Sequence, residues 1–185
     1  MRAVRNDWTA DDLDNFPEDN IRREIFDGVL RTRRALPSDH QTLTMLLAAV
    51  LMRTCPDHLF VTQANEVELG PRRRVTPDFM AVTFASARAS PSVFAPTDVA
   101  LAAEVISPGT KRIDSVIKLA YYAQAGIPHF WLITMRPDIS VTAFDLRPDF
   151  SGYHPIATFT GDQHIRLDQP WPVDISLPSI RPRNL

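Results

Sequence analysis

The chain has 185 residues, enough for a domain with a hydrophobic core, and 44% of them are hydrophobic, as in ordinary globular proteins. Its net charge of −2 excludes a protein that coats nucleic acid by overall charge, so any such binding must depend on local patches. One cysteine excludes an intrachain disulfide, and no apolar run approaches the ~20 residues of a membrane-spanning helix. The N-terminal residues also lack the apolar core of a signal peptide, so we expect a cytoplasmic protein outside membranes.

The pattern of apolar and turn-forming residues predicts a hairpin that turns at Asp27-Gly28, then a helix, three strands, a second helix and a fourth strand. The expected bounds are 22–34, 38–53, 60–69, 75–83, 99–106, 111–125 and 129–134. A further strand is expected over 139–146, followed by weaker strands to about 175. The middle of the chain therefore reads α-β-β-β-α-β, which predicts a single α/β domain over 1–185 around one mixed sheet.

Two acids interrupt apolar strands. Glu104 lies in the run 101–106 and Asp78 in the run 75–82, where an ionised carboxylate is costly unless a cation pairs with it. Because side chains alternate across a strand, both acids project to one face if the two strands are neighbours in the sheet. Carboxylates that close repel each other unless a cation lies between them, and Mg²⁺ or Mn²⁺ prefers such oxygen ligands. A bound metal would activate a water and polarise a phosphoryl oxygen.

Lys118 lies on the second predicted helix, fourteen residues after Glu104. It could orient the attacking water or stabilise developing charge, and we expect it to act in catalysis and contribute little to folding. Simpler interpretations stay open for each residue. Glu104 could pair with a structural arginine, Asp78 could belong to a Pro-Asp turn, and Lys118 could form a helix-surface pair with Asp114, four residues earlier.

A longer motif carries a resemblance to a known family. It consists of residues 104–110 (EVISPGT), Asp114, Lys118, Tyr122, residues 125–128 (AGIP) and Trp131. With the hairpin segment 23–28, His40-Gln41 and Pro77-Asp78, it resembles the Uma-type putative restriction endonuclease family of the PD-(D/E)xK nuclease superfamily, over about residues 16–180. The resemblance implies a restriction-endonuclease-like fold, with an αβββαβ core, an N-terminal hairpin and C-terminal strands.

The same resemblance implies a Mg²⁺- or Mn²⁺-dependent endonuclease that hydrolyses DNA. Its metal would be held by Asp78, Glu104 and the backbone carbonyl of Val105. The superfamily lysine would fall at position 106, which is Ile106 here, and the resemblance suggests that Lys118 has taken its place. Glu24 resembles an additional acid found in some members, and His40 is expected near the site, although a histidine at a helix start that makes one hydrogen bond is an equal alternative.

Arg72, Arg73 and Arg74 come just before the Asp78 strand and could bind DNA phosphates, although a solvated turn is an equal interpretation. The leading hypothesis is a metal-dependent DNA endonuclease. The alternative is a catalytically inactive module of the same fold that binds nucleic acid or protein, since fold does not guarantee activity. A homodimer is expected for the enzyme because two related sites cut both strands of a duplex most simply.

Overall fold

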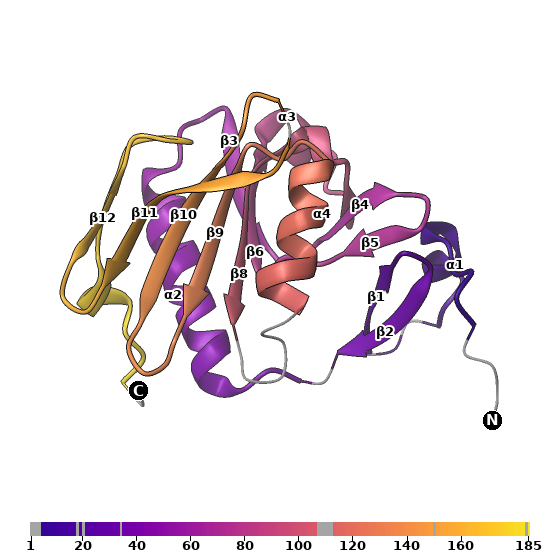
Figure 1. Cartoon of the computed structure of the whole chain (residues 1–185), viewed down its shortest axis with the longest axis horizontal. Coiled ribbons are helices and arrows are strands. Elements are labelled where there is room, and N and C mark those ends of the chain that lie inside the picture. Colours follow the sequence, from indigo (N-terminus) through magenta and orange to yellow (C-terminus); the bar gives the residue numbers. More distant parts are fainter. Residues whose placement is uncertain are drawn as a thin grey trace.

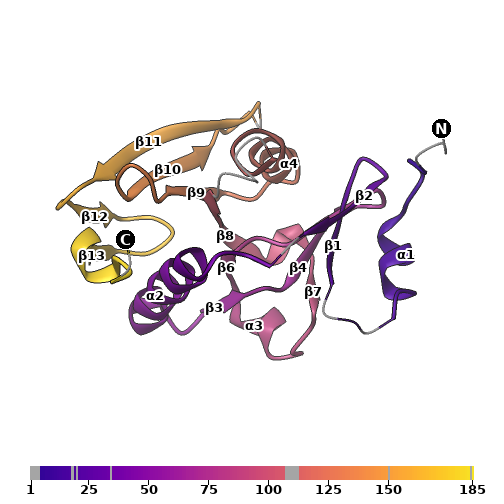
Figure 2. The same cartoon turned by 90° about the horizontal axis from the view of Figure 1, so that it is seen from below.

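The computed structural model describes residues 5–17, 19, 21–33, 35–106, 113–149, 151–183 and 185. A six-stranded sheet forms its centre, in the order β11-β10-β9-β8-β6-β3. These strands are β3 (Leu59–Gln63), β6 (Phe79–Thr83), β8 (Val99–Ile106), β9 (His129–Thr134), β10 (Ser140–Leu146) and β11 (Tyr153–Thr160). All neighbours are antiparallel except β8 and β9, which are parallel and joined through helix α4 (Leu119–Gln124). Helix α2 (Ser38–Thr54) lies on one face of this sheet and α4 on the other (Figures 1 and 2).

A second sheet has the order β2-β1-β5-β4-β7 and projects beyond the central sheet (Figure 1). Its strands are β1 (Arg22–Phe26), β2 (Val29–Arg33), β4 (Glu66–Gly70), β5 (Arg73–Val75) and β7 (Val93–Phe94). The predicted hairpin is confirmed as β1 and β2, with Asp27 and Gly28 at φ values of 50° and 84°. Short elements complete the chain: α1 (Ala10–Asp14), α3 (Phe84–Ala87), strands β12 (His164–Leu167) and β13 (Val173–Ser176), and 3₁₀ turns Pro96–Asp98 and Leu177–Ile180.

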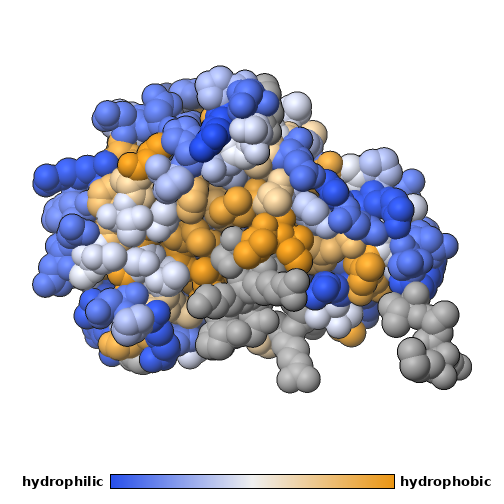
Figure 3. Space-filling model, in the orientation of Figure 1, coloured by the Kyte–Doolittle hydropathy of each residue, from blue (hydrophilic) through white to orange (hydrophobic). Residues whose placement is uncertain are grey.

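The central sheet has a hydrophobic core on each face. On β8, Leu101, Ala103 and Val105 face the core beneath α2, whereas Ala102 faces the core beneath α4. This alternation follows from the strand geometry, in which successive side chains point to opposite faces. It places Glu104 on the α4 side of the sheet, together with Ala102. Hydrophobic side chains also gather at the middle of the outer face around α4, while hydrophilic ones cover much of the periphery (Figure 3).

The predicted α-β-β-β-α-β order is confirmed, but the prediction of one sheet is wrong. The expected strand over 60–69 is two strands, because Ala64 adopts a left-handed φ of 59° and the chain bends from β3 in the central sheet into β4 in the second. The expected strand over 75–83 is also divided, into β5 and β6. Pro77 lies between them and has no N–H to donate to a sheet ladder. This break leaves Asp78 at the entrance to β6.

The second predicted helix is only partly within the described residues. Residues 107–112, which include the predicted helix start, lie outside them. The chain then forms a π-helical turn over Ile113–Lys118, which is followed directly by α4. Helix α4 ends shortly before Gly126, and this glycine has a φ of 79°. Within the part of the chain that the structure describes, no helix is both long and apolar enough to cross a membrane.

Candidate active site

The register of β6 and β8 brings the two predicted acids side by side. Phe79 pairs with Ala103, and the N–H of Asp78 donates to the carbonyl of Ala103 at 3.0 Å. Asp78 comes one residue before this pair, just outside β6, and its carboxylate accepts the N–H of Val105, so both acids lie at the same end of the two strands. Glu104 contacts Lys118 and Tyr122 on the α4 side of the sheet, whereas Asp78 contacts His40 at the start of α2, so the expectation that the two acids share one face stays a prediction.

Glu104 belongs to a group of three charged residues, Glu24, Glu104 and Lys118, that we call the buried charge cluster. Lys118 Nζ lies 2.8 Å from Glu104 Oε1, 2.8 Å from Glu24 Oε1 and 2.8 Å from the carbonyl oxygen of Thr76. The Tyr122 hydroxyl donates to Glu104 Oε1 at 2.7 Å. Glu104 and Lys118 have no exposed surface, and Glu24 is 1% exposed. An ammonium with three acceptors is well matched to its surroundings, since it has three N–H bonds to donate.

These contacts decide between the alternatives that the sequence left open. Lys118 is a charged partner of Glu104. Lys118 is buried, so a helix-surface pair is not its role, and the side chain of Asp114 lies outside what the structure describes. The expectation that Lys118 contributes little to folding stays a prediction, and the burial of its ammonium between two carboxylates favours the opposite outcome, because its removal would leave both charges uncompensated.

Glu24 reaches the cluster from the hairpin because of the break between β5 and β6. Its Oε1 accepts the N–H of Thr76 at 2.9 Å, just before Pro77. That N–H lies just after the end of β5, where the regular ladder of backbone hydrogen bonds stops. The carboxylate of Glu24 therefore accepts this N–H in place of a backbone carbonyl. The second sheet is thereby attached to the central sheet at the site itself.

The side chains of Asp78 and His40 form hydrogen bonds to the backbone of Val105, near the end of β8. The ladder between β6 and β8 begins at Phe79, so side chains take over the backbone groups of Val105 on that side. Its N–H donates to Asp78 Oδ2 at 2.8 Å, and its carbonyl contacts His40 Nε2 at 2.9 Å. The same His40 nitrogen is 3.2 Å from Asp78 Oδ2. His40 is 1% exposed and belongs to the first turn of α2, so the start of this helix is attached to the end of β8.

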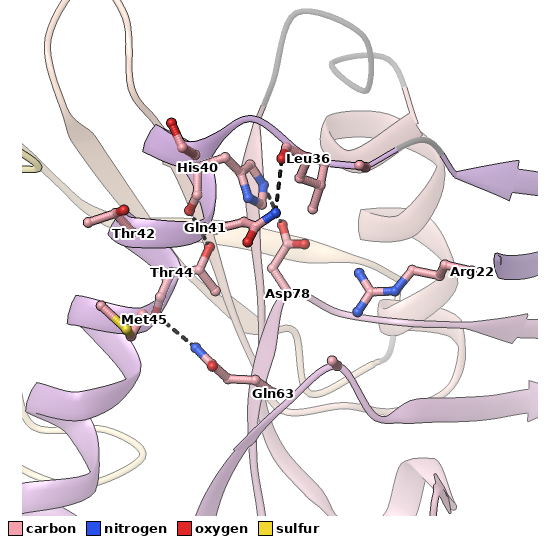
Figure 4. A pocket seen from close by; sticks show the side chains of 12 residues that line it. Arg22, Leu36, His40, Gln41, Thr42, Thr44, Met45, Gln63 and Asp78 are labelled. Atoms are coloured by element: carbon pink, nitrogen blue, oxygen red, sulfur yellow. Dashed lines mark hydrogen bonds and ion pairs between the residues drawn. The ribbon is translucent and has the colours of Figure 1, made fainter. Parts of the chain in front are cut away.

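A groove of about 650 Å³ opens beside Asp78 and His40. It follows the first turns of α2, with Gln41, Thr44 and Met45, and is bounded elsewhere by Gln63, Ala64 and Arg22 (Figure 4). Asp78, only 4% exposed, lies between His40 and Arg22 in this view. The groove connects the candidate site to solvent, whereas the buried charge cluster lies behind Asp78 in the protein interior.

The three arginines that were predicted to bind DNA donate hydrogen bonds to other groups of the protein. Arg72 donates to the backbone carbonyls of Asn6 and Asp27, at 2.7 and 2.9 Å, and passes over Gly28, where a Cβ atom would be 2.4 Å from its guanidinium. Arg73 pairs with Asp27, donates to Gln124 at 2.6 Å and covers the Tyr121 ring.

Arg74 is 5% exposed and bonds to Asp14, Glu66 and the carbonyl of Ala10. In the described structure, the three arginines therefore connect β5 and the residue before it to the hairpin turn, α1 and α4. Their role as phosphate contacts stays a prediction.

Tyr122 is a residue of this site to which the sequence analysis gave no role. It lies four residues after Lys118, so the two side chains occupy one face of the helical segment and both reach Glu104 Oε1. That spacing, read together with a buried acid, is the signal that could have identified it.

The oxygen donors at this site fit a divalent metal ion. With all groups ionised, Asp78, Glu24 and Glu104 carry three negative charges and Lys118 one positive charge, which leaves two negative charges at a buried location. One divalent cation would neutralise them. Among the described residues, no group of three or more His, Cys, Asp or Glu side chains is arranged to hold a metal. A site here therefore depends on two carboxylates, the Val105 carbonyl and waters, as Mg²⁺ commonly does.

A protein of known structure shares this fold. A crystal structure described as a putative nuclease belonging to DUF820, from Anabaena variabilis, matches with a TM-score of 0.71 and 13% identity, over 93% of this chain and 96% of that one. At this identity the likeness establishes the shared α/β fold. The family model Uma2, described as Putative restriction endonuclease, matches residues 10–179, and the chain belongs to this family. Comparison with curated proteins finds no match.

Proposed function

We propose that this protein is a metal-dependent endonuclease that hydrolyses phosphodiester bonds in DNA. Membership of the restriction endonuclease family and the shared fold support nuclease function. The observation that carries the proposal is that Asp78 hydrogen-bonds to β8 on both sides of Glu104, at the Ala103 carbonyl and the Val105 N–H, with Lys118 bonded to Glu104 at 2.8 Å. Mg²⁺ or Mn²⁺ would be held by both carboxylates and by the carbonyl of Val105.

When bound, the metal would supply an activated water and polarise the phosphoryl oxygen. The residues around it have separate tasks. Lys118 and Tyr122 both donate to Glu104 Oε1, so they keep this carboxylate ionised and hold its orientation. Because the three N–H bonds of Lys118 have protein acceptors, we expect it to act on the developing negative charge through its own charge and not by direct donation.

One observation favours the alternative of an inactive binding module. Protein donors already contact each proposed ligand group: Val105 N–H at Asp78 Oδ2, His40 at the Val105 carbonyl, and Lys118 at Glu104 Oε1. Such a network could persist for stability after catalysis is lost. The two candidates differ in one property, because only the enzyme needs a metal to reach these oxygens.

The deciding experiment combines cleavage with metal binding. We expect native protein to cut plasmid or single-stranded DNA with Mg²⁺ or Mn²⁺, and Glu104→Gln to abolish cutting. Glu68→Gln on β4 is the matched control and should retain activity. Mn²⁺ should also raise the Tm of the native protein by linkage and leave that of Asp78→Ala unchanged. Equal stabilisation of both proteins, or cutting by Glu104→Gln, would contradict the assignment.

A further inference from the structure

The groove beside Asp78 is larger than a metal ion and its waters require. Its volume of about 650 Å³ is in the range of about 300–1,000 Å³ that is typical of small-molecule sites. A phosphate at Asp78 would fill only part of it. The remainder extends along α2 toward Gln41 and Met45, and across to Gln63 (Figure 4). This space adjoins the proposed reaction site, so a ligand there would be continuous with the scissile group.

Arg22 provides a positive charge on the groove. It is the only Lys or Arg among the described residues that line it, and its guanidinium points toward Asp78 across the groove (Figure 4). Arg22 begins β1, two residues before Glu24, whose carboxylate is fixed by Lys118 and Thr76. The strand that supplies Glu24 to the buried charge cluster thus places a guanidinium where a phosphate neighbouring the scissile one would lie.

Two amide side chains have orientations that suit a nucleobase. Gln41 Nε2 donates to the carbonyl of Leu36 at 3.0 Å, and Gln63 Nε2 donates to the carbonyl of Thr44 at 3.0 Å. Each bond uses one of the two amide hydrogens and restrains the group, while the other N–H and the amide oxygen remain to pair with a base edge. Met45 is 55% exposed and adds an adaptable apolar surface.

We propose that this groove is a nucleotide subsite for an unpaired strand. Arg22 binds a phosphate next to the scissile one, and Gln41, Gln63 and Met45 contact an unstacked base. The proposal rests on the proposed function and specifies its substrate. The Watson–Crick edges and the faces of bases are open to such contacts only where the strand is unpaired. Strong duplex binding typically uses about 6–10 phosphate contacts, whereas the described lining has one arginine and the chain has a net charge of −2.

The first test measures binding without cleavage. Asp78→Asn protein in EDTA is titrated by fluorescence anisotropy with a labelled eight-nucleotide single strand and with a duplex of the same length, at several salt concentrations. We expect at least about tenfold tighter binding of the single strand. Adding Arg22→Gln should lower the slope of log affinity against log salt by about 0.7, the value for one phosphate neutralised on a single strand.

Arg53→Gln, an exposed position in the last turn of α2, is the control and should leave the slope unchanged. Duplex binding as tight as single-strand binding would overturn the proposal, as would equal slopes for Arg22→Gln and Arg53→Gln.

The second test examines the base contacts. Gln63→Ala and Met45→Ala should weaken single-strand binding at every salt concentration without changing the slope, because neither side chain is charged. Met52→Ala is the matched control, since Met52 is 50% exposed on α2 but does not line the groove. Unchanged affinity in both Gln63→Ala and Met45→Ala, with Tm values equal to that of the parent, would overturn the base contact.

The outcomes separate this proposal from the proposed function. If native protein cleaves DNA but single-strand binding does not depend on Arg22, the subsite proposal is overturned and the proposed nuclease function stands. Binding that depends on Arg22, with no cleavage by native protein under Mg²⁺ or Mn²⁺, would keep the subsite and overturn the nuclease.

Discussion

Two groups of charged residues occupy opposite ends of strands β5 and β1, and they differ in their access to water. In the buried charge cluster, the side chains of Lys118 and Glu104 are fully buried, and the side chain of Glu24 is 2% exposed. In the arginine group, Arg73 and Arg74 pair with acids that remain hydrated, and Arg72 donates to backbone carbonyls. The side chains of Asp27 and Asp14 are 58% and 64% exposed.

The difference in hydration predicts different consequences when a partner is removed. An exposed acid that loses its arginine is simply solvated by water, so an exposed ion pair contributes little. A buried acid that loses its lysine keeps a charge in a medium of low polarity. Similar residue types therefore attach the hairpin turn in one region, and form a buried group of mutually compensating charges in the other. The predictions below test this contrast, beginning with the largest effect.

Lys118→Met should cost about 3–5 kcal/mol of unfolding free energy, because it leaves Glu24 and Glu104 buried without their cation. For a chain of this size, the loss lowers Tm by roughly 6–20 °C, which thermal denaturation measures. Adding Glu24→Gln should recover part of the loss, since one of the two uncompensated charges is then removed. A Tm for Lys118→Met equal to that of native protein would contradict the contrast. Cleavage should be lost in both variants.

Arg74→Met should have a smaller effect, about 2–3 kcal/mol in urea denaturation. Arg74 is buried and makes charged hydrogen bonds to Asp14 and Glu66; one such bond contributes about 1.5–3 kcal/mol, and the exposure of both acids keeps the combined effect well below the sum of two. Its acids can be hydrated after the change, unlike Glu24 and Glu104. A cost greater than that of Lys118→Met would show that burial of the acids does not separate the two regions.

We expect Tyr121 to make the folding stability depend on pH under alkaline conditions. Burial and then the hydrogen bond to Asp27 raise the pKa of Tyr121 to about 12 from its ordinary value of 10. The folded state therefore keeps the proton more strongly than the unfolded state. Its contribution is complete below pH 10 and is lost as the pH rises toward 12, by roughly 2 kcal/mol. Stability curves of native protein and Tyr121→Phe should converge over this interval; parallel curves would show that Tyr121 does not titrate as described.

The smallest effect is expected from Arg72→Gln combined with Arg73→Gln. Each duplex phosphate that a protein neutralises contributes about 0.9 to the salt slope. These guanidinium groups already bond to Asp27, Gln124 and backbone carbonyls, so we expect a smaller change than Arg22→Gln produces. Anisotropy titrations in the Asp78→Asn background measure it. A drop near two units would restore these arginines as principal phosphate contacts.

The sequence was sufficient to predict the order of elements and the two acids. Strands such as 99–106 and 129–134 were predicted with their observed bounds, because buried strands are continuous apolar runs. Glu104 and Asp78 stood out because a charge in such a run needs an explanation. Lys118 stood out as a lysine near the two acids, although its spacing alone favoured a surface pair with Asp114, and the family resemblance then supported a catalytic role.

Tertiary structure decided where the sheets divide and which groups meet. Ala64 and Pro77 interrupt apolar runs that look continuous in the sequence, and the resulting second sheet carries Glu24 to Lys118. The contacts of His40 with Val105 and of Tyr122 with Glu104 join residues 65 and 18 positions apart. Local pattern describes which face of an element is apolar. It does not contain the distance between two elements, and at this site that distance determines whether a charge is solvated, paired or available to a metal.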